Sequence, residues 1–103
     1  MKIAVGLPAY NEEKNIASII AKLEKIANLI IVCDDGSSDL TSTIASKMGA
    51  IVISHEKNMG YGAAIRSLFL KAKELDIDIL VTFDADGQHD VNDIKKVVEP
   101  ISK

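Results

Sequence analysis

Four short apolar runs alternate with segments of helical period along the chain. The runs are rich in isoleucine and valine and cover residues 2–7, 29–33, 50–54 and 77–83. Their apolar positions are nearly continuous rather than alternating, which is typical of strands covered on both faces in a parallel sheet. We therefore predict four buried strands.

The segments between and after the strands carry apolar residues at helical spacing. In the first, Asn11 is expected to cap a helix whose acidic first turn suits the helix dipole. Asp39 or Ser38 is expected to begin a second helix, which Gly49 ends. A third is predicted from about residue 61 to 73, and a fourth after Asp90. The buried faces are expected to consist of Ile16, Ile19, Ile20, Leu23, Ile26 and Ala27, then Ile44, Ala45 and Met48, then Ala64, Ile65, Leu68, Phe69 and Ala72, and last Ile94, Val97, Val98 and Ile101, with Pro100 ending or distorting the last helix.

This alternation predicts an α/β fold, a Rossmann-like open parallel sheet with helices on both faces. We infer the strand order 3-2-1-4, with the switch point between the first and fourth strands. The fourth strand would then be an exposed edge, and we expect it to pair with a second copy, as in a homodimer, or with another chain. We draw no boundary within residues 1–103 and treat them as one domain.

Composition narrows the classes of partner. The chain has 103 residues, 48% of them hydrophobic and 26% charged, which is ordinary for a globular protein. A net charge of −3 gives no electrostatic reason to expect nucleic acid. No apolar run approaches the ~20 residues of a membrane span, so we expect no transmembrane segment. The single Cys33 suits a reducing cytoplasm.

Polar clusters follow the end of each predicted strand, at residues 8–12, 34–39, 55–62 and 84–90. In open α/β sheets the carboxyl ends of the strands carry the ligand crevice. The clusters after strands one and four are expected to face each other across the switch point.

The Asp84-Ala85-Asp86 sequence carries the most chemistry. Residues two apart in an extended segment point the same way, so both carboxylates can meet one ligand. With Gln88 they offer hard oxygen ligands that suit Mg²⁺ or Mn²⁺ and a bound diphosphate. The competing interpretation is a solvated acidic turn at a helix start, but the preceding strand and the neighbouring clusters favour a metal site.

Other polar residues allow two interpretations each. Asp35 either belongs to the turn around Gly36 or touches a ligand. Gly60 and Gly62 either let a phosphate approach backbone N–H groups or allow close helix packing. Arg66 is either a phosphate partner or a solvated surface residue.

The remaining candidates are aromatic residues, histidines and the cysteine. Tyr10 and Tyr61 are candidate crevice aromatics, with packing at the core edge as the alternative for Tyr61. His55 and His89 lack metal-ligand spacing to each other or to Cys33, which argues against zinc. Cys33 is expected to be a buried thiol.

Four motifs in this order resemble those of one enzyme family. They are Leu-Pro-Ala-Tyr-Asn-Glu-Glu at 7–13, Asp-Asp-Gly-Ser-Ser-Asp at 34–39, Asn-Met-Gly-Tyr-Gly at 58–62 and Asp-Ala-Asp-Gly-Gln-His-Asp at 84–90. The chain is similar to glycosyltransferase family 2, especially its dolichyl-phosphate mannosyltransferase-like and polyprenyl-phosphate branch. The resemblance implies a GT-A fold and an inverting, metal-dependent transfer from a GDP- or UDP-sugar. It also implies a polyprenyl phosphate or another glycan or lipid acceptor, at the cytoplasmic face of a membrane.

The resemblance also implies roles for particular residues. Pro8, Tyr10 and Glu12 would line the nucleotide, Asp35 would contact its base, and the strand end at Cys33 would lie beside it. Asp84, Ala85 and Asp86 would meet the diphosphate, with Asp84, Asp86 and Gln88 on the metal and Asp86 acting with it in catalysis.

The chain departs from the family at two points. Val91 stands where members often have proline, and members continue well beyond residue 103 with the acceptor site and the catalytic base. These residues would therefore be the nucleotide-sugar-binding half of a domain, and the base is not expected among them. The alternative is a non-catalytic nucleotide- or metal-binding module. A receiver domain, a haloacid dehalogenase-type phosphatase and a sugar nucleotidylyltransferase each require a different loop after the first strand.

Overall fold

The computed structural model describes residues 2–83 and the backbone of residues 98–100. Five strands form one sheet in the order β3-β2-β1-β4-β5. The strands are β1 (Ile3–Ala9), β2 (Leu29–Asp34), β3 (Ile51–Ser54), β4 (Ile79–Thr82) and β5 (Val98–Pro100), and the helices are α1 (Ile16–Leu23), α2 (Thr41–Lys47) and α3 (Tyr61–Glu74). The first four strands are parallel, which confirms the predicted order 3-2-1-4.

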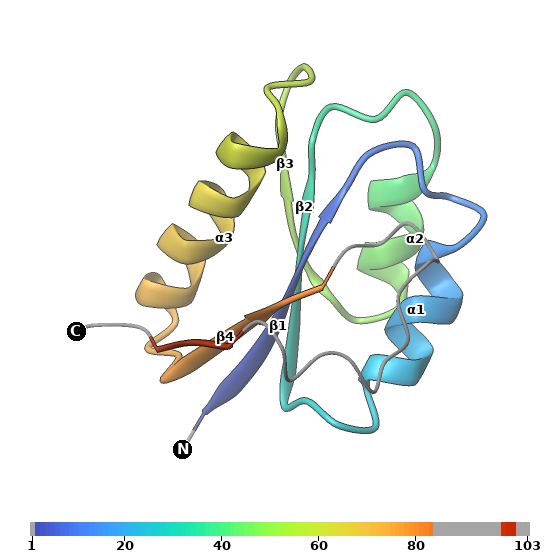
Figure 1. Cartoon of the computed structure of the whole chain (residues 1–103). Coiled ribbons are helices and arrows are strands. Elements are labelled where there is room, and N and C mark those ends of the chain that lie inside the picture. Colours follow the sequence, from blue (N-terminus) through green and yellow to red (C-terminus); the bar gives the residue numbers. More distant parts are fainter. Residues whose placement is uncertain (1, 84–97, 101–103) are drawn as a thin grey trace.

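The helices cover both faces of the sheet, as predicted. In Figure 1, α1 and α2 lie on one face and α3 lies on the other. Each face has its own apolar core, because a nearly continuous apolar strand buries alternate residues on opposite sides. The core under α1 and α2 includes Val5, Leu7, Ile16, Ile20, Leu23 and Val32, and the core under α3 includes Ala4, Ile31, Ala64, Leu68, Ala72 and Leu80.

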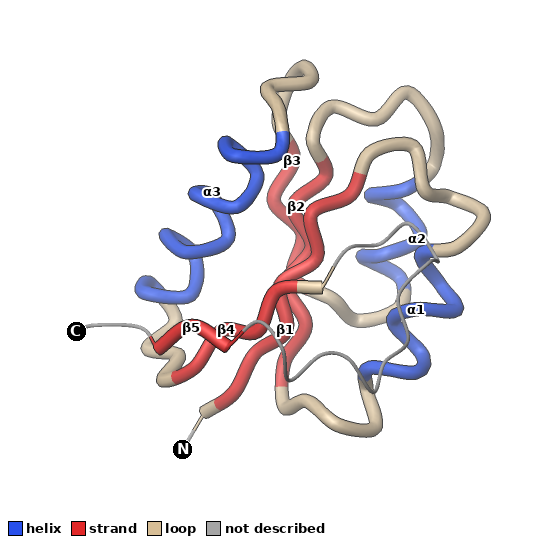
Figure 2. The backbone as a smooth tube through the Cα atoms, viewed as in Figure 1, coloured by secondary structure: helices blue, strands red, loops and turns tan. Residues whose placement is uncertain are grey.

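The fourth strand is not a sheet edge, so that prediction is wrong. β5 pairs antiparallel with β4, with Val81 opposite Val98 and Ile79 opposite Pro100 (Figure 2). The helix predicted to include residues 98–100 is replaced there by strand, while Ile94, Val97 and Ile101 lie outside the described residues. Proline is tolerated in an edge strand, where one side of the backbone needs no ladder partner, and valine favours strand. A homodimer through an unpaired β4 therefore loses its basis.

The first helix begins later than predicted. Its N-cap residue is Asn15 rather than Asn11, and Asn11 instead adopts a φ of 52°. The second helix begins one residue later than an Asp39 cap would place it: its N-cap residue is Leu40, while the Asp39 carboxylate accepts a hydrogen bond from the backbone N–H of Thr41 at 2.9 Å. Gly49, with a φ of 94°, follows its C-cap residue. Asn11 does not cap the first helix, because it forms hydrogen bonds with the loop that follows β2.

Candidate functional site at the carboxyl edge

The carboxyl ends of β1, β2 and β3 meet at one edge of the sheet. The backbone N–H of Asp35 donates to the carbonyl of Ala9 at 2.8 Å, and the N–H of His55 donates to that of Asp34 at 2.9 Å. At the end of β4, the N–H of Phe83 donates to the carbonyl of Gly6 at 3.0 Å. The three loops that follow β1, β2 and β3 therefore start side by side, and Phe83, the residue that precedes Asp84 in the sequence, lies beside β1.

The loop after β1 is tied to the loop after β2 by side-chain hydrogen bonds. Asn11 receives a hydrogen bond from the backbone N–H of Ser38 on its Oδ1 atom, while its own N–H donates to the Ser37 hydroxyl. Glu13 makes similar bonds to the same loop: its N–H donates to Asp39 Oδ2, and its Oε2 atom accepts from the Leu40 N–H. These carboxylates and amides hold the two loops together as one unit.

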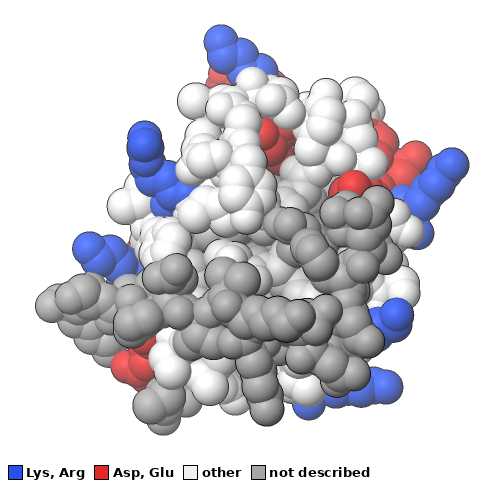
Figure 3. Space-filling model, in the orientation of Figure 1, with Lys and Arg blue, Asp and Glu red and all other residues white. Residues whose placement is uncertain are grey.

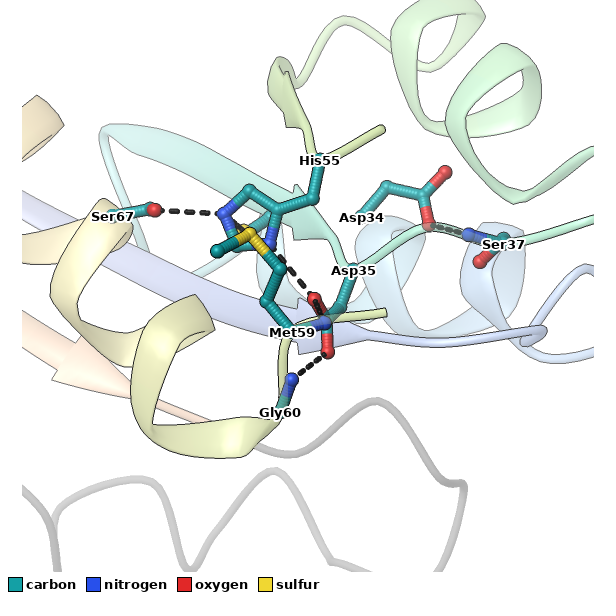
Figure 4. Close-up of polar contacts among 8 residues, drawn as sticks. Asp34, Asp35, Ser37, His55, Met59, Gly60 and Ser67 are labelled. Atoms are coloured by element: carbon teal, nitrogen blue, oxygen red, sulfur yellow. Dashed lines mark hydrogen bonds and ion pairs between the residues drawn. The ribbon is translucent and has the colours of Figure 1, made fainter. Parts of the chain in front are cut away.

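The Asp35 carboxylate ties the loop after β2 to the loop after β3. Its Oδ1 atom lies 2.8 Å from His55 Nδ1 and accepts the backbone N–H of Met59, also at 2.8 Å. Its Oδ2 atom accepts the N–H of Gly60 at 2.9 Å. Figure 4 shows this carboxylate between the His55 ring and the Met59–Gly60 backbone, while Asp34 points the other way toward Ser37.

The environment of Asp35 favours its charged form. Only 6% of its side chain is exposed, and burial alone would raise the pKa of a carboxyl group. The hydrogen bonds from His55, Met59 and Gly60 outweigh that effect and hold the pKa of Asp35 below its ordinary value. The loop after β3 is therefore fastened by a buried carboxylate that remains ionised.

Glycine at position 36 allows these loops to approach closely. Gly36 has a φ of +78°, and a Cβ atom there would lie 2.3 Å from the carbonyl carbon of Lys57 and 2.4 Å from the nitrogen of Asn58. The sequence predicts the positive φ of Gly36, but its close approach to the loop after β3 follows only from the fold.

The predicted nucleotide-lining residues have different environments. Tyr10 is 48% exposed at the end of β1, and Pro8 is half-buried on β1 opposite Cys33. Glu12 is partly buried and accepts a hydrogen bond from the Asn15 side chain at 3.1 Å. Cys33 is fully buried, as expected, and burial raises the pKa of its thiol to about 11.

The predicted diphosphate and metal residues Asp84, Ala85, Asp86 and Gln88, together with His89, lie outside the described residues. Within residues 2–83, no group of three or more histidine, cysteine, aspartate or glutamate side chains is arranged to hold a metal ion. Two carboxylates and an amide oxygen fit Mg²⁺ or Mn²⁺ in chemical type.

The sequence alone did not connect His55 with Asp35. The sequence does contain a signal for this contact. β2 and β3 are parallel neighbours in which Asp34 lies opposite Ser54, so the residues that follow them, Asp35 and His55, are expected to lie opposite each other. The hydroxyl of Ser67, 2.9 Å from His55 Nε2, is less accessible to such reasoning, since it lies within α3. A contact between side chains at the ends of two strands can be predicted from sequence only when it is known that the two strands are neighbours in the sheet.

The surface of the described residues shows no concentration of positive charge on the face that Figure 3 displays. Lysine and arginine side chains are scattered around the outline of the molecule in Figure 3 rather than gathered in one patch on this face. A cavity of about 160 Å³ lies at the opposite edge of the sheet, near Asn28 and Gly49, away from the loops described above. No helix among the described residues has the length and hydropathy to span a membrane.

The fold and the site define the class of this protein. It is a Rossmann-like α/β chain, a partial GT-A domain, in which polar loops gather at the carboxyl edge of a parallel sheet. Residues 4–103 match the family described as Glycosyl transferase family 2, and the chain belongs to that family of enzymes.

Curated relatives and solved structures agree with this assignment. The chain is 43% identical to the UDP-N-acetylglucosamine–dolichyl-phosphate N-acetylglucosaminyltransferase of Methanococcus voltae, over 92% of this chain and 45% of the relative. It is 33% identical to the dolichol-phosphate mannosyltransferase of Pyrococcus furiosus, over 98% of this chain and 30% of the relative. The chain thus spans less than half of the length of these relatives.

Among solved structures, glucosyl-3-phosphoglycerate synthase from Mycobacterium tuberculosis, in complex with Mn²⁺, UDP and glucosyl-3-phosphoglycerate, is similar with a TM-score of 0.68 and 34% identity. The match covers 82% of this chain and 33% of that one. Mannosyl-3-phosphoglycerate synthase from Rubrobacter xylanophilus shares the fold, with a TM-score of 0.74 and 22% identity over 90% of this chain and 33% of that one.

Proposed function

We propose that this protein binds a nucleoside-diphosphate sugar at the carboxyl edge of its sheet and contributes to metal-dependent, inverting transfer of the sugar. The acceptor we propose is a polyprenyl phosphate or another glycan or lipid, at the cytoplasmic face of a membrane. The observation that carries the proposal is the meeting of three interlocked loops beside the strand that leads into Asp84-Ala85-Asp86. Relatives named as dolichyl-phosphate transferases support the acceptor class.

The described residues would provide the nucleotide side of the crevice. Tyr10 is exposed there as an aromatic surface, and Pro8 and Glu12 lie on the same loop or the strand leading into it. Asp35, which we propose to contact the base, lies at the neighbouring strand end, where its carboxylate also accepts hydrogen bonds from the backbone of Met59 and Gly60. Because the loops are tied to one another, a nucleotide would meet a largely preformed surface, which lowers the entropy cost of binding.

Asp84, Asp86 and Gln88 would hold Mg²⁺ or Mn²⁺, which would neutralise the charge that develops on the diphosphate leaving group. A solved relative that contains Mn²⁺ together with UDP supports this role. The residues assigned above do not include a base for the acceptor. The alternative is a module that binds nucleotide and metal without transferring sugar.

Calorimetric titration with UDP and with GDP, each with and without Mn²⁺, tests the donor site. We expect metal-dependent binding that Asp86→Asn weakens by at least about tenfold, since it removes a carboxylate ligand, and every tenfold corresponds to about 1.4 kcal/mol. Asp76→Asn is the matched control, because Asp76 is an exposed carboxylate at the turn between α3 and β4, and asparagine tolerates its φ of 56°.

Two results of the titration would overturn the proposal in whole or in part. Failure of the folded protein to bind either nucleotide would remove the donor site, and equal losses in Asp86→Asn and Asp76→Asn would remove the metal role. Incubation with labelled UDP- or GDP-sugar and a polyprenyl phosphate then separates transfer from binding alone. The anomeric configuration of any product, determined by NMR, tests inversion.

A further inference from the structure

His55 is a partly buried histidine that none of the proposed roles uses. Its side chain is 11% exposed and lies between the end of β2 and the helix α3. Nδ1 is 2.8 Å from Asp35 Oδ1, and Nε2 is 2.9 Å from the hydroxyl of Ser67. The Cys33 sulfur also lies 3.6 Å from Nε2. The ring therefore connects Asp35 to a helix on one face of the sheet.

The chemistry of the partners indicates where the protons lie. An ionised carboxylate can only accept, so Nδ1 carries a hydrogen and donates it to Asp35. In the neutral ring Nε2 is then an acceptor for the hydroxyl of Ser67. Cys33 does not compete as an anion, because burial keeps its thiol protonated, with a pKa of about 11. The ring is thus held by one donated and one accepted hydrogen bond.

The contact with His55 limits how the Asp35 carboxylate can rotate. The terminal torsion of aspartate is broad, so a carboxylate without fixed partners samples many orientations. Here Oδ1 must face both His55 and Met59, which leaves Oδ2 aimed at the N–H of Gly60. Met59 and Gly60 end the loop after β3 and lead directly into α3.

We propose that His55 is a positioning residue of the donor site, because it holds the Asp35 carboxylate in the orientation that fastens the Met59–Gly60 backbone beside the nucleotide crevice. Ser67 fixes the far side of the ring to α3. The relevance of His55 to binding rests on the proposed function, whereas the fastening of the loop does not depend on it.

Two conservative variants separate the two sides of the ring. In His55→Asn the side-chain amide nitrogen takes about the place of Nδ1 and can still donate to Asp35, and in His55→Gln it takes about the place of Nε2, near Ser67. Amide hydrogen exchange at Met59 and Gly60 measures the fastening without ligand, and titration with UDP or GDP in the presence of Mn²⁺ measures its effect on binding. Thermal unfolding of both variants provides the measure of general damage.

We expect exchange at Met59 and Gly60 to be about tenfold faster in His55→Gln, the low end of what a hydrogen bond to a charged group contributes. Nucleotide affinity should fall by a similar factor, while His55→Asn restores most of both properties at a comparable unfolding temperature. Equal behaviour of the two variants, or losses that simply follow the unfolding temperature, would show that His55 only fills space. Faster exchange in His55→Gln without any nucleotide binding by the wild type would overturn the link to the donor site but not the fastening.

Discussion

Substitution of Gly36 by alanine tests whether the loops at the carboxyl edge are packed as closely as the structure shows. Gly36 and Gly49 both have positive φ values, +78° and +94°. An alanine Cβ at position 36 would lie within 3.0 Å of three backbone atoms of Lys57 and Asn58, whereas at position 49 it would meet nothing within 4 Å. Gly49→Ala is therefore a control that shares the backbone strain but not the contact.

The expected loss of stability follows from these two effects. A left-handed alanine costs about 1–2 kcal/mol, and the change of the unfolded chain is similar in both variants. Crowding at position 36 adds about 1–3 kcal/mol, because backbone atoms cannot rotate away as a flexible side chain can. We expect Gly36→Ala to lose about 2–5 kcal/mol of unfolding free energy and Gly49→Ala about 1–2 kcal/mol.

Urea denaturation of the wild type and both variants measures this difference, provided that the slopes of the transitions agree. If Gly36→Ala and Gly49→Ala lose the same unfolding free energy to within about 0.5 kcal/mol, the close approach of the loops after β2 and β3 is refuted. A steeper or shallower slope in one variant would instead indicate a changed unfolded or native state, and calorimetry would then replace the extrapolation.

Two further predictions concern the core and the behaviour in acid. Leu68 is fully buried against the sheet, whereas Leu70, on the same helix, is 62% exposed. In urea denaturation, Leu68→Ala should therefore lose about 2–5 kcal/mol of unfolding free energy and Leu70→Ala less than about 0.5 kcal/mol. Similar losses in the two variants would contradict the assignment of the buried face of α3. The pKa of Asp35 in the folded protein lies below its ordinary value, so the stability that this carboxylate contributes is present above about pH 4 and is lost as the pH falls through the folded pKa. Asp35→Asn should therefore flatten the decrease of the urea midpoint between pH 5 and pH 3, and an unchanged decrease would show that other carboxylates cause it.

The strand order and the meeting of polar loops at the carboxyl edge were predictable because they depend on local pattern and on general rules of chain connection. Continuous isoleucine- and valine-rich runs separated by helical segments predict a parallel sheet, and right-handed crossovers limit the strand order. β1 to β4 and α3 appear within two residues of their predicted ends. The prediction of a helix across residues 98–100 was wrong. Val98 and Pro100 pair with β4, and this tertiary contact overrides the helical spacing of the local sequence.

The sequence by itself determined the four parallel strands, their order, and the meeting of the polar clusters at 8–12, 34–39 and 55–62 at the carboxyl edge of the sheet. Only the tertiary structure decided what each polar side chain binds. Asn11 was expected to cap its own helix, but its amide instead binds Ser38 in the next loop, and Asp35 is occupied by His55 and the backbone of Met59 and Gly60. The physical reason is that helix and strand formation depend on neighbours a few residues apart, whereas a polar side chain at a loop satisfies its hydrogen bonds with whatever group the fold brings within 3 Å or so.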